Sequence, residues 1–349
     1  MNEHANPHLS PPARPRRHRV NVVLAAALAL VLAFSLAGCG SDNDDTPGAG
    51  LETTRLTIAA GPVADMAPIH LALKQGVFKA EGLDVQLKTF AGGAAAAAAL
   101  VGGQIDISFG NYGSLFLARQ GGQDLRIVGE ASIGATTATG AAGTISVIAL
   151  PKSKVQTAKD LAGKRICVTS LKGTPTAIVS AALRNAGVDP KTVKYSEMPL
   201  PNVGAALTGG TVDAAYVLEP YVTKLGTTLG TRVVLDPLGG QNAGLALNGY
   251  SVTGKFADAH PKTIAAFQRA LAKAQGLATR AAVQQILPTY IKGMDDKTAK
   301  LMALPDFPQG VNPTRIQRVA DLMVTDGQLK KPLKVADFTI VPKTRTSGT

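Results

Sequence analysis

Small polar side chains gather in three loops that each follow a short apolar stretch of the chain. The loops are residues 61–66, 110–114 and 170–176. The first and third lead into predicted helices, and helix amino termini favour anions because their first backbone N–H groups have no partner within the helix. The second loop combines amide and hydroxyl donors with an aromatic ring. These residue types predict non-covalent binding of a small solute.

Few residues of this chain could carry nucleophilic or metal chemistry. Past residue 50 the cysteine is Cys167 and the histidines are His70 and His260, which excludes a histidine-rich or cysteine-rich metal site. Cys167 lies in a predicted strand and is expected to be a small buried residue, and packing or exposure is preferred for His70. Asp106 and Asp213 occupy equivalent places in a repeated pattern, so a structural turn role is preferred over acid–base chemistry. We therefore expect no catalytic residue, no metal and no cofactor.

The first fifty residues are typical of an export signal. Four arginines between residues 14 and 19 precede an apolar run at 20–36, which is too short and wrongly flanked for a transmembrane helix. The run ends in LAGC at residues 36–39, which resembles a bacterial lipobox. The resemblance implies that residues 1–38 are a signal peptide and that Cys39 carries the lipid anchor, including a palmitate-type chain. Residues 39–50 then form a flexible tether.

Two questions about this leader stay open. An ordinary secreted protein, cleaved at a nearby small residue, is the alternative to a lipoprotein. The export route is either the general secretory or the twin-arginine pathway, because an Arg-Arg pair is present in a poorly fitting context.

The net charge of +12 does not indicate a nucleic-acid partner. After the leader the basic residues are scattered and form no run. The chain has no tryptophan, and aromatic residues make up 4% of it, so few rings are available to stack on bases.

Past residue 50, short apolar strands alternate with helices, which is the pattern of βαβ units. Strands are predicted at 56–60, 85–87 and 105–109, with helices at 67–75 and 94–101. The same order returns with strands at 164–169, 192–195 and 212–217 and helices at 176–185 and 203–208. Residues 98–106 (AALVGGQID) also match residues 205–213 (AALTGGTVD), which predicts two similarly built lobes. Convergence on common α/β patterns is the alternative.

Two extended runs, at 144–150 and 245–252, cross between the lobes and predict a two-strand hinge. Helices are expected at 261–278, 281–290, 296–304 and 314–326, packed onto the first lobe. Lobe 1 comprises residues 51–145 plus 250–349, and lobe 2 comprises residues 150–245. An inter-lobe cleft is expected where the strand ends of the two lobes face each other.

Several motifs occur in one order along nearly the whole chain after the leader. They are AP at 67–68 with GxFxxEGLDV at 76–85, ALxxGQID at 99–106, DLxGK at 160–164, and ALxxGxVDA at 206–214 with EP at 219–220. In these motifs the chain resembles the bacterial periplasmic solute-binding proteins related to nitrate, sulfonate and taurine receptors and to thiamine-pyrimidine synthases. The resemblance implies an α/β, two-lobed, periplasmic-binding-protein-like (type II) fold.

The resemblance also implies a function. The chain is expected to be a monomeric receptor, not an enzyme, that captures a small solute and delivers it to the permease and ATPase subunits of an ABC transporter. Its expected location is the outer face of the cytoplasmic membrane. In the family the glutamate of the Glu-Pro pair can face the ligand. The candidate ligand contacts are Gly61, Pro62, Asp65, Met66, Asn111, Tyr112, Ser170, Lys172, Gly173, Thr174, Tyr216 and Glu219.

Alternatives stay open for several of these residues and for the function. Asn111, Ser170 and Thr174 are also explained as helix caps, and Lys172 as a solvated loop lysine. A sensor lipoprotein without a transporter is one functional alternative. A pyrimidine-synthase-like enzyme is the other, although that branch uses a cysteine-rich motif that this chain lacks.

The solute is expected to carry an anionic or strongly accepting group. Helix amino termini and Lys172 suggest a sulfonate or nitrate, whereas Glu219 and the tyrosines equally suit taurine or a flat pyrimidine precursor. No arginine lies in the candidate loops, which argues against a bidentate guanidinium clamp.

Overall fold

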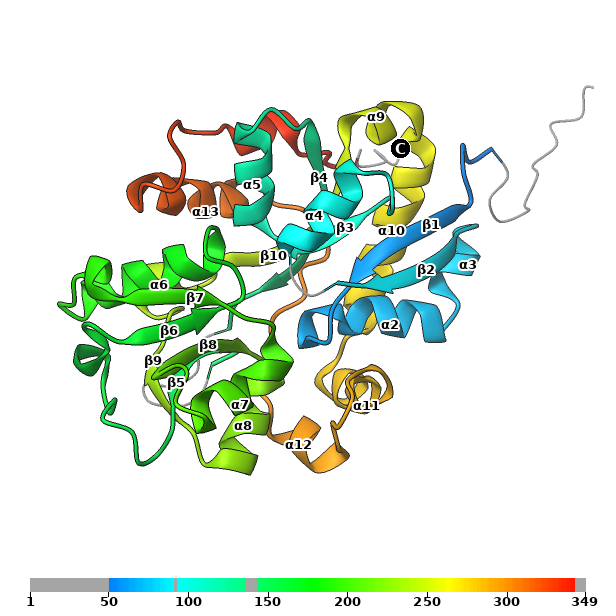
Figure 1. Cartoon of the computed structure of the whole chain (residues 1–349). Helices are drawn as coiled ribbons and strands as arrows, with labels where there is room; N and C mark the ends of the chain where they lie inside the picture. The colour runs from blue at the N-terminus through cyan, green and yellow to red at the C-terminus, as the bar shows by residue number, and fades with distance from the viewer. Residues whose placement is uncertain (1–49, 91–92, 136–142, 343–349) are drawn as a thin grey trace, which may run out of the picture. The chain divides into compact units, whose positions relative to one another are not determined.

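The computed structural model describes residues 50–90, 93–135 and 143–342, all within one compact unit, Thr46–Thr349 (Figure 1). The predicted signal peptide, Cys39 and nearly all of the tether lie outside the described residues. Among the helices in these three ranges, none is long and apolar enough to cross a membrane.

The described chain begins with a parallel pair of strands. β1 (Arg55–Ala60) pairs with β2 (Asp84–Thr89) from one end to the other, and α2 (Ala67–Lys74) and α3 (Val77–Ala80) connect them. A parallel pair needs such a crossover, because its strands cannot be joined by a tight hairpin. Gly76 lies between the two helices with a φ of 70°, a left-handed conformation that favours glycine.

A three-stranded antiparallel sheet has the order β3-β10-β4. Its strands are β3 (Ser108–Asn111), β10 (Ala246–Thr253) and β4 (Leu125–Ile133). β10 pairs with both neighbours, and its residues 246–252 are buried. An isolated bridge between Ile58 and Ile107 links β1 to the segment that leads into β3.

A five-stranded mixed sheet has the order β7-β6-β8-β5-β9 (Figure 1). β6 (Arg165–Val168) is parallel to β7 (Lys194–Glu197) and β8 (Ala214–Leu218), whereas β5 (Ile145–Ala149) is antiparallel to β8 and β9 (Arg232–Leu235). β5 and β8 are buried at every position, as expected for the strands inside a sheet that is covered on both faces.

Helices cover these sheets. The helices not yet named are α4 (Gly93–Val101), α5 (Tyr112–Gln120), α6 (Thr174–Asn185), α7 (Val203–Thr208), α8 (Tyr221–Leu229), α9 (Gly254–Ala259), α10 (Pro261–Leu277), α11 (Arg280–Tyr290), α12 (Asp296–Leu301) and α13 (Pro313–Thr325). The short 3-10 helices are η1 (Ala64–Met66), η2 (Ala158–Leu161), η3 (Pro190–Thr192), η4 (Leu200–Asn202), η5 (Gly240–Asn242) and η6 (Val335–Phe338).

Three predictions about these elements need correction. The strand expected at 105–109 begins at Ser108, and the strand expected at 192–195 is displaced to β7 because η3 occupies 190–192. Asp189 caps η3 by accepting the N–H of Lys191 over 3.0 Å. The C-terminal helices do not pack on the first predicted lobe alone. α10 and α11 contact α2, but α12 contacts α8 and α13 contacts both α5 and α6.

Asp106 and Asp213 have the structural role that the sequence favoured. The Asp106 carboxylate accepts the N–H of Thr57 over 2.7 Å in β1. The Asp213 carboxylate accepts the N–H of Arg165 over 2.9 Å in β6 and pairs with the guanidinium of the same residue. Each carboxylate therefore ties the turn before one strand to the backbone of a neighbouring strand, in equivalent places of the repeat.

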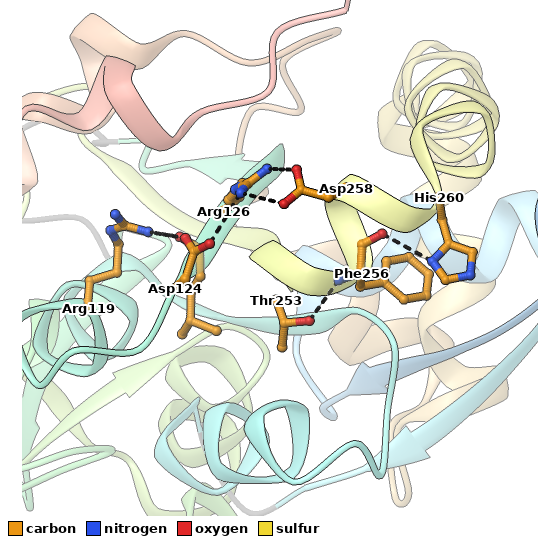
Figure 2. A network of polar contacts seen from close by, with 8 residues as sticks. Arg119, Asp124, Arg126, Thr253, Phe256, Asp258 and His260 are labelled. Atoms are coloured by element: carbon orange, nitrogen blue, oxygen red, sulfur yellow. Dashed lines mark hydrogen bonds and ion pairs between the residues drawn. The ribbon is translucent and has the colours of Figure 1, made fainter.

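An exposed network of ion pairs fastens α9 to β4 (Figure 2). Arg126 contacts Asp124 at 3.2 Å and Asp258 at 2.6 Å, and Arg119 contacts Asp124 at 3.2 Å. The Thr253 side chain caps the first turn of α9. Exposed pairs of this kind contribute at most about 1 kcal/mol each, so the network orients α9 more than it stabilises the fold.

Candidate functional site

A cavity of about 110 Å³ lies where loops and helix starts from the different sheets converge. A single water needs about 10–15 Å³ on this scale, so the cavity has room for a small solute. Much of its wall is apolar and includes the rings of Phe90 and Phe109. Its polar side chains are Asn111, Thr169, Thr174, Tyr216 and Asn248, and no described lining residue is charged.

Three helices begin at this cavity. Gly93 opens α4, Asn111 precedes α5, and Thr174 opens α6, and all three residues line the wall. The amino terminus of each helix carries a partial positive charge that attracts anions. The cavity therefore favours a negative group at these helix starts, although none of its described wall residues carries a positive charge.

The starts of α5 and α6 touch directly. The N–H of Gly113 donates to Thr174 Oγ1 over 3.0 Å. A Cβ on Gly113 would lie 2.2 Å from the Thr174 nitrogen, so glycine is required for this approach. The hydroxyl of Thr174 therefore serves α5 and not its own helix, and the cap interpretation of Thr174 is wrong.

Asn111 is the cap of α5 and also lines the cavity wall. Its Oδ1 accepts the N–H of Ser114 over 2.9 Å and the Ser114 hydroxyl over 3.3 Å, so Asn111 is the cap of α5. Because Oδ1 is engaged, the Nδ2 group is the part of the side chain left to donate. Nδ2 lies beside Gly93 at the cavity wall.

Asp65 lies behind the cavity wall and not in it. Its side chain is buried, and its Oδ1 accepts from Asn248 Nδ2 over 2.8 Å and from the hydroxyl of Ser132. Burial raises the pKa of Asp65, while these two hydrogen bonds oppose that rise. Asp65 therefore reaches the cavity through Asn248, which lines the wall and was not a predicted contact.

Two buried tyrosines and the half-buried Tyr290 lie within reach of the charge of Asp65. Burial, followed by the negative charge of Asp65, raises the pKa of Tyr216, Tyr250 and Tyr290 above the ordinary range. Of these, Tyr216 lines the cavity. Tyr290 donates its hydroxyl to the Val63 carbonyl over 3.0 Å and stacks on His70 at 3.7 Å, which confirms a packing role for His70.

Glu219 does not line the cavity. Its carboxylate accepts the N–H and hydroxyl of Thr223 over 3.0 and 2.7 Å and the N–H of Ala303 over 3.1 Å. Burial raises the pKa of Glu219 to about 7, although these bonds lower it. Glu219 thus ties α8 to the segment after α12, and the structure places this predicted ligand contact outside the cavity wall.

Other predicted contacts also lie away from the wall. Met66 is fully buried, and Tyr112 is a core residue whose hydroxyl donates to the Gly129 carbonyl over 3.4 Å. Ser170 and Lys172 line a different, wider groove beside α4 and α5, and Lys172 is exposed, as the solvated-lysine interpretation expects. Gly173 donates its N–H to Gln328 over 2.5 Å and precedes Thr174 without lining the cavity.

Of the twelve predicted ligand contacts, the wall therefore brings together Gly61, Pro62, Asn111, Thr174 and Tyr216. The wall also contains Phe90, Phe109, Thr169 and Asn248, which were not among the predicted contacts. Asn248 did leave a signal, because it is a polar residue inside the apolar run that forms β10. Cys167 is buried in β6 with its pKa raised to about 11 by burial, which confirms its expected structural role.

Comparisons with known proteins agree with this architecture. Residues 49–292 match the family model described as NMT1-like family. The taurine-binding periplasmic protein of Escherichia coli (strain K12) is 29% identical over 225 residues, which cover 64% of this chain and 66% of that protein.

Two solved structures share the fold. The alkanesulfonate-binding protein SsuA from Xanthomonas axonopodis pv. citri, bound to MOPS, matches with a TM-score of 0.68 and 20% identity over 82% of this chain and 98% of that one. The periplasmic nitrate-binding protein NrtA from Synechocystis PCC 6803 matches with a TM-score of 0.68 and 15% identity over 83% and 86%. These matches confirm the expected α/β periplasmic-binding-protein fold.

Proposed function

Because the chain belongs to the NMT1-like family, we propose that it is a solute-binding receptor that delivers a small organic or anionic solute to an ABC importer. The observation that carries this proposal is the small cavity where α4, α5 and α6 begin. Its wall offers hydrogen-bond donors, helix amino termini and aromatic surface. These groups suit reversible capture of a solute.

The expected solute classes are sulfonates, taurine, nitrate and pyrimidine precursors. The helix starts and Asn111 Nδ2 support an anionic or strongly accepting group, and Phe90 and Phe109 support an apolar or flat portion. The similarity to a taurine-binding protein adds weight to the sulfonate classes.

The proposed receptor is a monomer outside the cytoplasm, held to the outer face of the cytoplasmic membrane. Residues 1–38 would direct export, Cys39 would carry the lipid, and residues 39–50 would be the tether. The lobes proposed at 51–145 plus 250–349 and at 150–245 would close over the solute and present it to a permease with its ATPase.

A titration of the full-length protein in detergent tests this function. Alkanesulfonates, taurine, nitrate and pyrimidine precursors are added singly, and heat of binding and thermal shift are recorded. A solute present at 100 times its dissociation constant should raise the free energy of unfolding by about 2.7 kcal/mol. Binding by one class supports the receptor, and no binding by any class contradicts it.

Two further observations separate the alternatives. A receptor should co-purify with a permease and an ATPase and should be required for solute uptake, whereas a sensor lipoprotein should bind solute without either. A pyrimidine-synthase-like enzyme should change its bound compound chemically, which mass spectrometry of the bound compound would detect.

A further inference from the structure

Two asparagines stand side by side on one wall of the cavity. Asn111 in β3 and Asn248 in β10 are directly opposed partners in the antiparallel ladder, and both line the cavity. Opposed residues on neighbouring strands have their Cβ atoms roughly 5 Å apart and project to the same face. A small solute can therefore touch both side chains at once.

Their hydrogen bonds give the two amides opposite polarity. Asn111 uses Oδ1 to cap α5, which leaves Nδ2 as a donor. Asn248 uses Nδ2 to donate to Asp65 over 2.8 Å, which leaves Oδ1 as an acceptor. Because a carboxyl oxygen of Asp65 accepts this bond, Asp65 holds the amide of Asn248 in this orientation.

The charges around the two asparagines match this arrangement, with positive helix starts near the donor and a carboxyl group behind the acceptor. Asn111 lies at the start of α5 and near the start of α6, where helix dipoles are positive. Asp65 lies behind Asn248, is buried, and makes no ion pair with any Lys, Arg or His among the described residues. A buried carboxylate without a cation is costly, and a cationic group in the cavity would offset that cost.

We propose that this receptor selects a compact zwitterion over a plain anion. The anionic group lies at the starts of α5 and α6 and accepts from Asn111 Nδ2. An ammonium, about 5 Å or less from it, donates to Asn248 Oδ1, and Asp65 acts as a positioning residue behind that amide. This inference rests on the proposed function and specifies the substrate class of the same cavity.

The test uses matched pairs of solutes that differ in the ammonium group alone. Taurine is compared with ethanesulfonate, and β-alanine with propionate, by titration calorimetry of the full-length protein. At least one zwitterion should bind about tenfold or more tightly than its partner, because hydrogen bonds to charged groups are stronger than neutral ones. Asp65→Asn should remove this preference, read within the variant as the ratio of the zwitterion's affinity to that of its partner. The exposed Asp258→Asn should change neither.

A pH series gives a readout that needs no variant. The groups that face Asp65 are Tyr216 from β8, Tyr250 from β10 and Tyr290 from α11, and their pKa values are raised by burial and by Asp65. Their raised pKa values keep the tyrosines neutral, so Asp65 is the group among these four whose charge can change as pH falls. The preference for the zwitterion should shrink as pH falls and Asp65 takes up a proton, while binding of the plain anion should not follow this profile.

The outcomes separate this inference from the proposed function. If a plain anion binds as tightly as its amino analogue, the zwitterion inference is overturned and the receptor function stands. If Asp65→Asn folds and keeps the full preference, the role of Asp65 is overturned. If no compound of the wider panel binds, the proposed function fails and this inference fails with it.

Discussion

The backbone N–H of Gly113 donates to Thr174 Oγ1 over 3.0 Å, at the point where α5 and α6 begin. α5 follows β3 and α6 follows β6, which belong to different sheets, so this bond joins two helix starts at the cavity that come from different sheets. Gly113→Ala would force a Cβ within 2.2 Å of the Thr174 nitrogen. Because the obstacle is backbone, the helix starts must separate.

We expect Gly113→Ala to lower solute affinity by more than tenfold and to reduce the free energy of unfolding by about 1–3 kcal/mol. Calorimetry and urea unfolding measure the two effects. Gly226→Ala in α8 is the matched control, because a Cβ there meets no atom within 4 Å. The control should bind normally and be as stable as the parent or slightly more so. Normal binding by Gly113→Ala would contradict the importance of this contact.

Asn111→Asp separates capping from solute binding. An aspartate keeps the oxygen that accepts the Ser114 N–H, so the free energy of unfolding should change by less than about 1 kcal/mol. It replaces the Nδ2 donor with a negative oxygen, so affinity for an anionic solute should fall at least tenfold in titration calorimetry. Asn111→Ala should lose both the cap and the donor. An Asn111→Asp protein with unaltered affinity would remove Asn111 from the site.

The raised pKa of Glu219 should make the stability of the protein depend on pH. Its folded pKa is about 7, above the ordinary value of 4.5, so the folded state holds more protons than the unfolded chain between these values. The free energy of unfolding should therefore fall as pH rises from about 4.5 to 7, by up to about 3 kcal/mol from this group. The pKa values of other buried carboxyls are raised too, so the effect of Glu219 is isolated by comparison with a variant. Urea unfolding gives the free energy of unfolding of the parent and of Glu219→Gln at pH 5 and at pH 8, and the difference between the two proteins is compared at the two pH values. A difference that is equal at both pH values would show that Glu219 does not titrate here.

Substitutions of Glu130 and Arg315 should have strong, non-additive effects on the free energy of unfolding. Glu130 is fully buried and accepts from Arg315 Nε over 3.0 Å and from the N–H of Asn312 over 2.6 Å, which holds the start of α13. Arg315→Met leaves this carboxylate without its cation and should reduce the free energy of unfolding by about 3–5 kcal/mol. Adding Glu130→Gln to this variant should restore much of the lost stability. Thermal or urea unfolding of the parent, the two single variants and the double variant measures the coupling between the two side chains. Additive effects would mean that the pair is not coupled.

Much of the fold could be predicted because its signals are local. Apolar periodicity and terminal glycines or prolines located α2, α4, α10 and α13 within a residue or two. The match of 98–106 with 205–213 correctly paired Asp106 with Asp213. The strand at 192–195 was misplaced because Pro190 begins a 3-10 turn there, which apolar pattern alone does not reveal.

The site was harder to predict because its residues are defined by tertiary contacts. Gly61, Asn111 and Thr174 were found, since loops before helices are visible in the sequence. Glu219 was included through the family resemblance, but its carboxylate is engaged by Thr223 and Ala303, which lies far along the chain. Asn248 was missed because its role depends on Asp65, a partner almost two hundred residues away.

The most direct test of the central claim is a calorimetric titration of the parent protein and of Asn111→Asp with the solute that binds best in the panel. The account predicts one saturable site per chain in the parent and at least a tenfold loss of affinity in a variant that remains as stable. Equal affinity in both proteins, or binding that does not saturate, would contradict the assignment of this cavity as the solute site.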